Sequence, residues 1–144
     1  MSFQSVGLQI HMLSRQWRAL LDQQLAPLGF TQCSGVALAC IAAHQGVSQK
    51  ELASLLGIEA PSLVPVLDAL EAQGLVQRQP SATDRRQKVL VLLAAALPLV
   101  EQVNQVRLAL QQQVLADLSH EEQQLFVSLL QRVLGQVQQC QGAE

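Results

Sequence analysis

Residues 47–92 contain, in order, the signals for two short helices joined by a tight turn and then a hairpin. Ser48 and Glu51 stand three positions apart at the start of an amphipathic stretch, which is the spacing of a capping box. Gly57 supplies a left-handed residue that ends the first helix, and a second helix is expected over residues 60–73. Few folds accommodate this order of elements.

Two short apolar segments after the second helix predict an antiparallel hairpin. Residues 75–78 and 88–92 are strand-like, and the polar segment 80–87 between them is rich in turn-forming residues. A second helix presented by a tight turn fits a DNA major groove, and a hairpin carrying Arg85 and Arg86 suits the adjacent minor groove or phosphates. The segment is therefore predicted to form a winged helix-turn-helix.

Long helices are expected on both sides of this segment, over residues 5–25, 31–44 and 95–118 and again from residue 119. The predicted fold class is mainly α (α+β), a winged helix-turn-helix with long N- and C-terminal dimerisation helices. The terminal helices either simply cover the core or use their wide apolar stripes to form a twofold dimer, which we favour.

The predicted organisation is one integrated domain with three parts. Residues 1–30 form an N-terminal dimerisation helix, residues 31–93 the DNA-binding lobe, and residues 94–144 the C-terminal dimerisation helices. With 144 residues and 49% hydrophobic composition, the chain can bury one substantial core. No run approaches the roughly 20 apolar residues of a membrane span, and the start lacks a signal-peptide pattern, so we expect a cytoplasmic protein without membrane contact.

The charge distribution favours one local contact with nucleic acid. The net charge is −2, yet four of the nine Lys and Arg residues fall within residues 78–88. These are Arg78, Arg85, Arg86 and Lys88. A local basic feature on an acidic body suits a protein that reads one edge of a groove, and it predicts modest non-specific affinity because few phosphates are neutralised.

The order of these elements and several sequence motifs resemble the MarR family of bacterial transcription regulators. The motifs are most similar to those of its SlyA-like branch. The similarity is collinear over residues 8–137. The residues that carry it are Trp17-Arg18-Ala19-Leu20, Leu28-Gly29-Phe30-Thr31-Gln32, Gly57-Ile58-Glu59-Ala60-Pro61-Ser62-Leu63-Val64, Leu67-Asp68, Gly74-Leu75-Val76 and Asp84-Arg85-Arg86. The resemblance implies a homodimer that binds a pseudo-palindromic operator in double-stranded DNA, with repression as the favoured outcome.

The candidate DNA contacts lie on the two short helices and the wing. They are Ser48, Gln49, Ser62, Pro65, Val66, Arg85, Arg86 and Lys88. The resemblance implies that one wing arginine is braced by an acid while the other reaches DNA. In the alternative interpretation, a wing arginine pairs with Asp84 or Asp68 and only holds the hairpin.

The second helix departs from the SlyA-like pattern, which has an arginine where Pro65 stands. Proline removes a backbone donor and disfavours helical angles at Val64, so a kinked or later-starting helix is expected. No Lys or Arg occurs over residues 60–76, so the bidentate contact to guanine is lost. Ser62 and Val66 remain as candidates to contact a base or a thymine methyl group.

The resemblance also implies a ligand site for a small aromatic carboxylate, with Arg15, Trp17, Arg18 and Gly35 as candidate residues. A guanidinium and an aromatic wall suit an anionic ring, although for Trp17 itself we favour the interpretation as an ordinary core residue. Gly35 replaces a large aromatic of the SlyA-like branch, which predicts a roomier or differently shaped pocket.

No catalytic arrangement, phosphate-binding loop or zinc-ligand spacing occurs in the sequence, so we expect no enzyme, no metal and no cofactor. Two functions remain open. The leading one is a ligand-responsive DNA-binding regulator. The alternative is a winged-helix dimer with weakened or lost specific DNA binding, acting as a small-molecule-binding or protein-interaction module.

Overall fold

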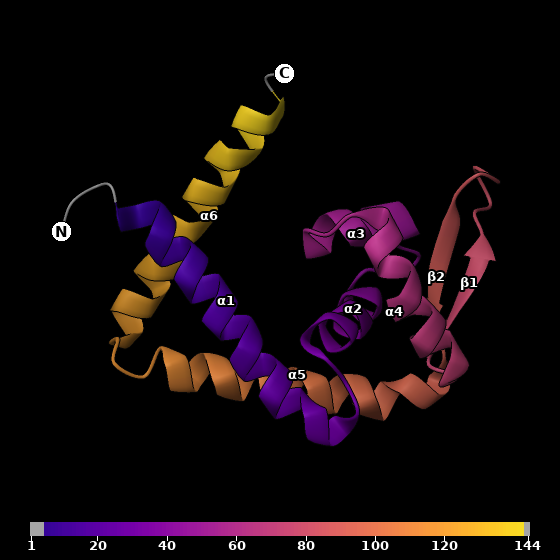
Figure 1. Ribbon diagram of the computed structural model, residues 1–144, viewed down its shortest axis with the longest axis horizontal. Helices are drawn as coiled ribbons and strands as arrows, with labels where there is room; N and C mark the ends of the chain where they lie inside the picture. Colours follow the sequence, from indigo (N-terminus) through magenta and orange to yellow (C-terminus); the bar gives the residue numbers. More distant parts are fainter. Residues whose placement is uncertain (1–4, 143–144) are drawn as a thin grey trace. The chain divides into compact units, whose positions relative to one another are not determined.

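The computed structural model describes residues 5–142, which form a mainly helical chain with one two-stranded antiparallel sheet (Figure 1). The predicted fold class is confirmed in these respects. The elements in chain order are α1 (Val6–Leu25), η2 (Ala26–Leu28), α2 (Gln32–Ala43), α3 (Gln49–Leu56), α4 (Ala60–Ala72), β1 (Val76–Pro80), β2 (Lys88–Leu92), η3 (Ala94–Ala96), α5 (Leu97–Val114) and α6 (His120–Gly142).

The chain divides into two compact units, the first ending at Leu108 and the second beginning at Ala109. The division falls inside α5, so the first turns of that helix belong to the unit that contains the helix-turn-helix. The three-part organisation with boundaries at residues 30 and 93 stays a prediction.

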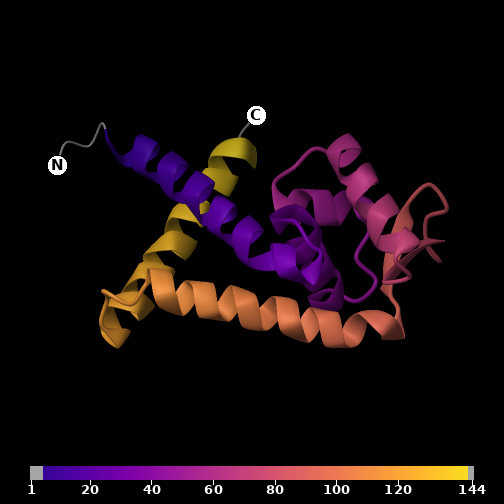
Figure 2. The ribbon, with the colours of Figure 1, turned by 60° about the horizontal axis from the view of Figure 1, so that its bottom comes forward.

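The core of the first unit is built from apolar side chains on α2, α3, α4 and the hairpin. Helix α2 is central because it is almost entirely apolar and contacts α1, α3, α4 and β2 (Figure 2). The large side chains that are at most 1% exposed include Leu25, Leu38, Ile41, Leu52, Leu63, Leu67, Leu70, Val76 and Leu90. Complete burial of each leucine contributes about 1.5–3 kcal/mol, which fixes α3 and α4 on this core.

The helix caps explain where α3 begins and ends. The Ser48 hydroxyl accepts a hydrogen bond from the Glu51 backbone N–H at 3.0 Å, and Gly57 ends the helix with φ +67°. Only half of the predicted capping box forms, because the exposed Glu51 side chain makes no return bond to Ser48 within residues 5–142. The same segment also pairs with β2, through a bridge between Ser48 and Val89.

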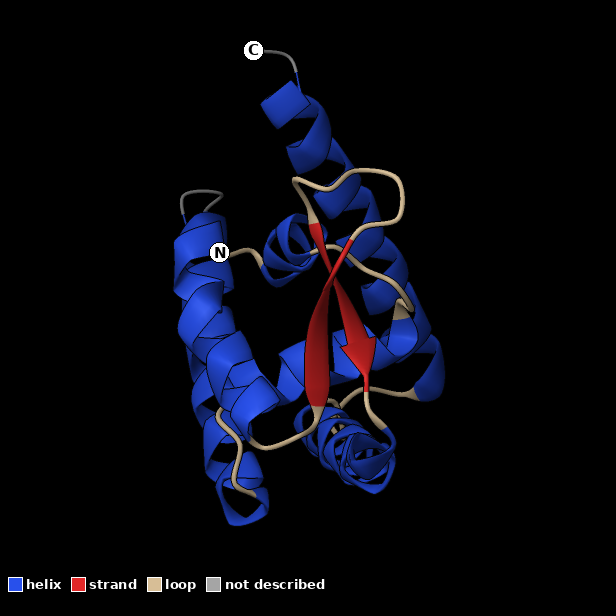
Figure 3. Cartoon of the chain, turned by 90° about the vertical axis from the view of Figure 1, so that its right-hand side faces the viewer, coloured by secondary structure: helices blue, strands red, loops and turns tan. Residues whose placement is uncertain are grey.

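The hairpin has a regular antiparallel register and is tied to the start of α3. Figure 3 shows its two strands in red. Val76 lies opposite Leu92, and Pro80 lies opposite Lys88. The Leu90 backbone N–H donates to the Val47 carbonyl at 2.9 Å on the other edge of β2. This anchoring holds the base of the wing against the helix-turn-helix.

The first strand begins one residue later than predicted and extends two residues further. Leu75 donates its backbone N–H to the Leu70 carbonyl at 3.0 Å, so it closes the end of α4 and does not start the strand. Beyond the strand, Ser81 donates to the Gln87 carbonyl at 2.9 Å, which prolongs the ladder to the loop at the hairpin tip.

The second unit contains the end of α5 and all of α6. Helix α5 ends at Val114, earlier than the predicted residue 118. In the turn that follows, the Gln123 side chain donates to the carbonyls of Leu115 and Leu118 at 3.0 and 3.1 Å. The predicted capping box of α6 forms in both directions. Glu122 N–H donates to the Ser119 hydroxyl at 3.2 Å, and Ser119 N–H donates to the Glu122 carboxylate at 2.9 Å.

Candidate nucleic-acid interface

Helix α4 runs without interruption from Ala60 to Ala72, with Pro65 inside it. The expectations of a later start and of non-helical angles at Val64 are therefore wrong, since Val64 lies within the helix. Proline at 65 deprives only the Pro61 carbonyl of its helical donor, and Pro61 is exposed to water. Three fully buried leucines hold the helix in place on its inner side.

The outward side of α4 is apolar, apart from Ser62 and the carboxylates described below. Ser62 and Pro65 are exposed as predicted, whereas Val66 is half-buried. Val64 has 38% of its surface exposed. The exposure of Val64 was not predicted from the sequence. The spacing of the three buried leucines contains the signal that places Val64 on the flank of the exposed face.

Arg78 on β1 binds two carboxylates of α4. Its Nη2 lies 2.5 Å from Asp68 Oδ1 and 2.7 Å from Glu71 Oε2, and its Nε donates to Glu71 Oε2 at 2.8 Å. Hydrogen bonds from Asp68 and then Glu71 raise the pKa of Arg78 above its ordinary value. The Arg78 side chain is 20% exposed. Arg78 is therefore a bridge between wing and helix and is not a free cation.

The wing tip presents Arg85 and Arg86 to solvent. Both are exposed, and neither side chain forms an ion pair within the part of the chain that the structure describes. The Asp84 carboxylate instead accepts the Arg86 backbone N–H at 3.0 Å and so stabilises the turn. The alternative in which Asp84 or Asp68 braces a wing arginine is therefore wrong, because Asp68 is bound to Arg78.

The other candidate DNA contacts differ in accessibility. Lys88, at the start of β2, is exposed, and Gln49 at the first position of α3 is half-buried. Ser48 is only 4% exposed, and its hydroxyl caps α3. The prediction that the Ser48 side chain faces DNA is corrected by this burial.

The candidate ligand residues do not converge within the first unit. Arg15 and Arg18 are exposed on α1, and Arg18 Nε donates to the Ser14 carbonyl at 3.4 Å. Trp17 is half-buried, so it is not an ordinary core residue. Gly35 is buried, and a Cβ atom there would lie 2.8 Å from Leu25 Cδ1. The expected extra room at Gly35 is absent because Leu25 fills it.

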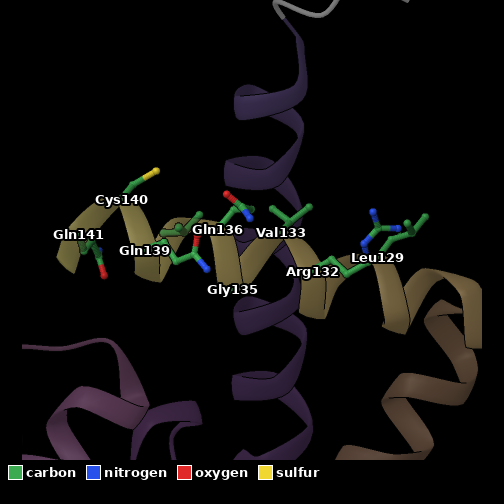
Figure 4. Close-up of a pocket in the computed structure, with 9 residues that line it drawn as sticks. Leu129, Arg132, Val133, Gly135, Gln136, Gln139, Cys140 and Gln141 are labelled. Carbon is green, nitrogen blue, oxygen red and sulfur yellow. The ribbon is translucent and has the colours of Figure 1, made fainter. Parts of the chain in front are cut away.

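Two hollows lie elsewhere on the described surface. One, of about 900 Å³, follows α6 and is lined by residues that include Leu129, Val133 and Cys140 (Figure 4). Another, of about 510 Å³, lies between the end of α2 and α3, beside His44 and Leu55. Neither includes a candidate ligand residue.

The cysteines and the remaining polar side chains give no sign of metal chemistry. Burial raises the pKa of the Cys33 and Cys40 thiols, which reduces the thiolate fraction that could react or bind a metal. Within residues 5–142, no three His, Cys, Asp or Glu side chains gather closely enough to hold a metal ion.

Membrane-spanning potential is limited to bent pairs of helices. In the described part of the chain, no single helix is both long and apolar enough to cross a membrane. Two pairs of consecutive helices are long and apolar enough only when their helices are taken together. The segment α1–η2 is bent by 79° against α2, and α3 is bent by 108° against α4.

The comparisons with known proteins agree with this architecture. The MarR family model matches residues 30–88. The transcriptional regulator PA3341 is 36% identical over 92% of this chain and 98% of its own, with a TM-score of 0.83. Mutant MarR from E. coli complexed with operator DNA is 27% identical over 93% of this chain and 99% of its own, with a TM-score of 0.79. MepR from S. aureus, in a complex with DNA, is 27% identical over 91% of this chain and 97% of its own, with a TM-score of 0.79. The chain belongs to the MarR family of transcriptional regulators.

Proposed function

We propose that this chain is a homodimeric, ligand-responsive regulator that binds a pseudo-palindromic operator and represses transcription in the cytoplasm. Helix α4 enters the major groove, and the wing carries Arg85 and Arg86 into the adjacent minor groove. The single observation that carries this proposal is the wing tip, where two exposed arginines lack any ion-pair partner within residues 5–142.

The charge balance around the helix-turn-helix supports DNA as the partner. Arg78 compensates much of the negative charge of Asp68 and Glu71, which would otherwise repel phosphates beside α4. Lys88 adds a third exposed cation near the wing arginines. Similar structures of E. coli MarR and S. aureus MepR are complexes with DNA, which supports the same partner for this chain.

The first helix of the motif supplies positioning contacts. Gln49 and the exposed Lys50 stand in the first turn of α3, where a positive helix dipole and free backbone N–H groups favour a phosphate. Ser62, near the start of α4, offers a hydroxyl to a base or a phosphate. These contacts fix the register of α4 on the duplex.

Exposed apolar side chains on α1 and on α6 support a dimer. Within α6, Leu125, Leu134 and Val137 are 58%, 58% and 48% exposed, and no residue of this helix is buried. Within α1, Leu8 and Ile10 are 61% and 54% exposed. A second copy of the chain would remove these surfaces from water. A twofold dimer requires two half-sites related by the same symmetry.

The ligand proposed is a small aromatic carboxylate bound by Arg15, Trp17 and Arg18 without any cofactor. The exposed guanidinium groups can pair with a carboxylate, and the half-buried indole supplies an apolar wall. Gly35 drops out of this proposal because Leu25 occupies the space beside it.

One observation favours a second function. Helix α4 carries no Lys or Arg, so a winged-helix dimer that has lost specific DNA binding would show the same helix. Such a protein would act as a small-molecule-binding or protein-interaction module.

A competition experiment separates the two functions. The test measures binding of the dimer to its own upstream DNA by fluorescence anisotropy, with unlabelled scrambled duplex as competitor. A regulator should prefer its operator by at least about 10³-fold, and benzoate, as the ligand probe, should weaken that binding. Equal competition by scrambled DNA would refute the regulator and support the module.

A further inference from the structure

The outward surface of α4 lacks the side chains that read guanine or adenine. Residues 60–72 contain no Lys, Arg, Asn or Gln, so bidentate contacts to purine edges are not available from this helix. Ser62 is the only exposed hydroxyl on it. The helix must therefore discriminate bases mainly by a different chemistry.

The two carboxylates of α4 are both engaged by an arginine of the hairpin. Asp68 and Glu71 can in principle accept a hydrogen bond from the cytosine amino group. Both instead bind Arg78, at 2.5 Å and 2.7 Å from its Nη2. Each carboxylate uses one oxygen for this contact, Asp68 Oδ1 and Glu71 Oε2, so the ion pairs orient both acids toward β1 and reduce their negative charge.

Apolar contact is what remains, and it has one partner in the major groove. Val64 is 38% exposed, and Pro65 is exposed beside it on the outward side of α4. Thymine is the base that presents a methyl group in the major groove, and apolar side chains recognise it there. The exposed valine and proline side chains thus match thymine by their chemistry.

The wing favours the same base composition for an independent reason. Arg85 and Arg86 project from the hairpin tip without acidic partners in the described chain. A-tracts have a narrow minor groove with enhanced negative potential, which attracts inserted arginines. Helix and wing therefore point to one class of DNA by two different physical effects.

We propose that Val64 and Pro65 read thymine methyl groups in the major groove of the operator half-site. This inference rests on the proposed function, since it assumes that α4 lies on DNA. It goes further by naming the base and the atoms that are recognised.

The test begins with duplexes selected by the full-length protein from a random 30-base-pair pool. The best duplex is then remade with uracil in place of thymine, which removes only the methyl group, or with 7-deazaguanine in place of guanine, which removes the N7 acceptor. We expect uracil to weaken binding about fourfold for each contacted thymine, the effect of exposing one methyl group. 7-Deazaguanine should change affinity less than about twofold.

Variants of the protein test whether the loss of affinity on replacing thymine by uracil comes from α4. Val64→Ala should reduce the thymine-to-uracil affinity ratio toward one, whereas Val100→Ala, the same substitution at a partly exposed valine of α5, should leave the ratio unchanged. Pro65→Arg should make binding sensitive to 7-deazaguanine, because it restores a donor fork.

Distinct outcomes overturn the inference and the proposed function. Specific binding that is insensitive to uracil but sensitive to 7-deazaguanine overturns thymine readout and leaves the regulator intact. An unchanged thymine-to-uracil ratio in Val64→Ala overturns the assignment to this helix face. Failure of the selection to enrich any sequence overturns both.

Discussion

Arg78 illustrates what can and cannot be read from a single residue in the sequence. The sequence groups it with Arg85, Arg86 and Lys88 as one basic cluster. In the structure it is bound to Asp68 and Glu71, ten and seven residues earlier in the chain. That pairing depends on how β1 packs against α4. In the sequence, the only indication of it is that the two acids stand three residues apart on one face of the helix.

Replacing Arg78 should weaken DNA binding without removing any DNA contact. Arg78→Gln exposes two uncompensated carboxylates on α4, and their screened repulsion of phosphates should lower affinity about two- to fourfold. The variant Arg78→Gln/Asp68→Asn/Glu71→Gln removes the repulsion and should recover affinity. Anisotropy titrations at two salt concentrations measure both. No recovery in the triple variant would indicate that Arg78 itself touches DNA.

Gly35 shows a second limit on what the identity of a single residue can predict. From the sequence, a glycine in place of an aromatic residue indicates empty space. The structure fills that space with Leu25, whose Cδ1 would lie 2.8 Å from an added Cβ. Whether a small residue opens a pocket or permits close packing depends on its neighbours, which the residue type alone does not specify.

At the scale of elements, the order of helices and strands could be predicted, because caps, glycine stops and apolar spacing act locally. Gly57 and the Ser119–Glu122 capping box lie where the pattern placed them. The end of α5 could not be predicted, because the turn after it is stabilised by Gln123 of the next helix, whose side chain bonds the Leu115 and Leu118 carbonyls. Helix α4 stayed continuous because burial of its leucines outweighs the local preference of proline.

The cost of Pro65 can be measured directly. Pro65→Ala restores the N–H donor for the Pro61 carbonyl and removes a steric clash, so the free energy of unfolding should rise by up to about 3 kcal/mol. Urea denaturation of the dimer measures this gain.

Pro61→Ala provides the matched control for that measurement. Pro61 stands in the first turn of α4, where the backbone N–H has no helical partner. Its replacement should change stability by less than about 1 kcal/mol. Equal effects at positions 61 and 65 would mean that the lost hydrogen bond at 65 carries no cost.

At the scale of the whole molecule, function follows from where charge and apolar surface gather, and the net charge of −2 is a poor guide. The uncompensated cations near the hairpin tip belong to the first unit, whereas α6 in the second unit has no buried residue. Helical periodicity predicted the apolar stripes. What covers them depends on a second chain, which a single sequence does not contain.

The central claim is that the wing arginines bind DNA, and the salt dependence of binding by Arg85→Ala/Arg86→Ala tests it most directly. Arg107→Ala/Arg132→Ala, which removes two exposed arginines from α5 and α6, is the matched control. Sedimentation should show a dimer at micromolar concentration for all three proteins, so that a loss of binding is not a loss of assembly.

The wing variant should lose measurable operator binding near 150 mM salt. At low salt, the slope of log affinity against log salt should be smaller by about 3.6, because the dimer loses four arginine contacts and each lost phosphate contact removes about 0.9. The control variant should keep the wild-type slope and affinity. Equal slopes and affinities for the wild type and the wing variant would contradict the role of Arg85 and Arg86 in binding DNA.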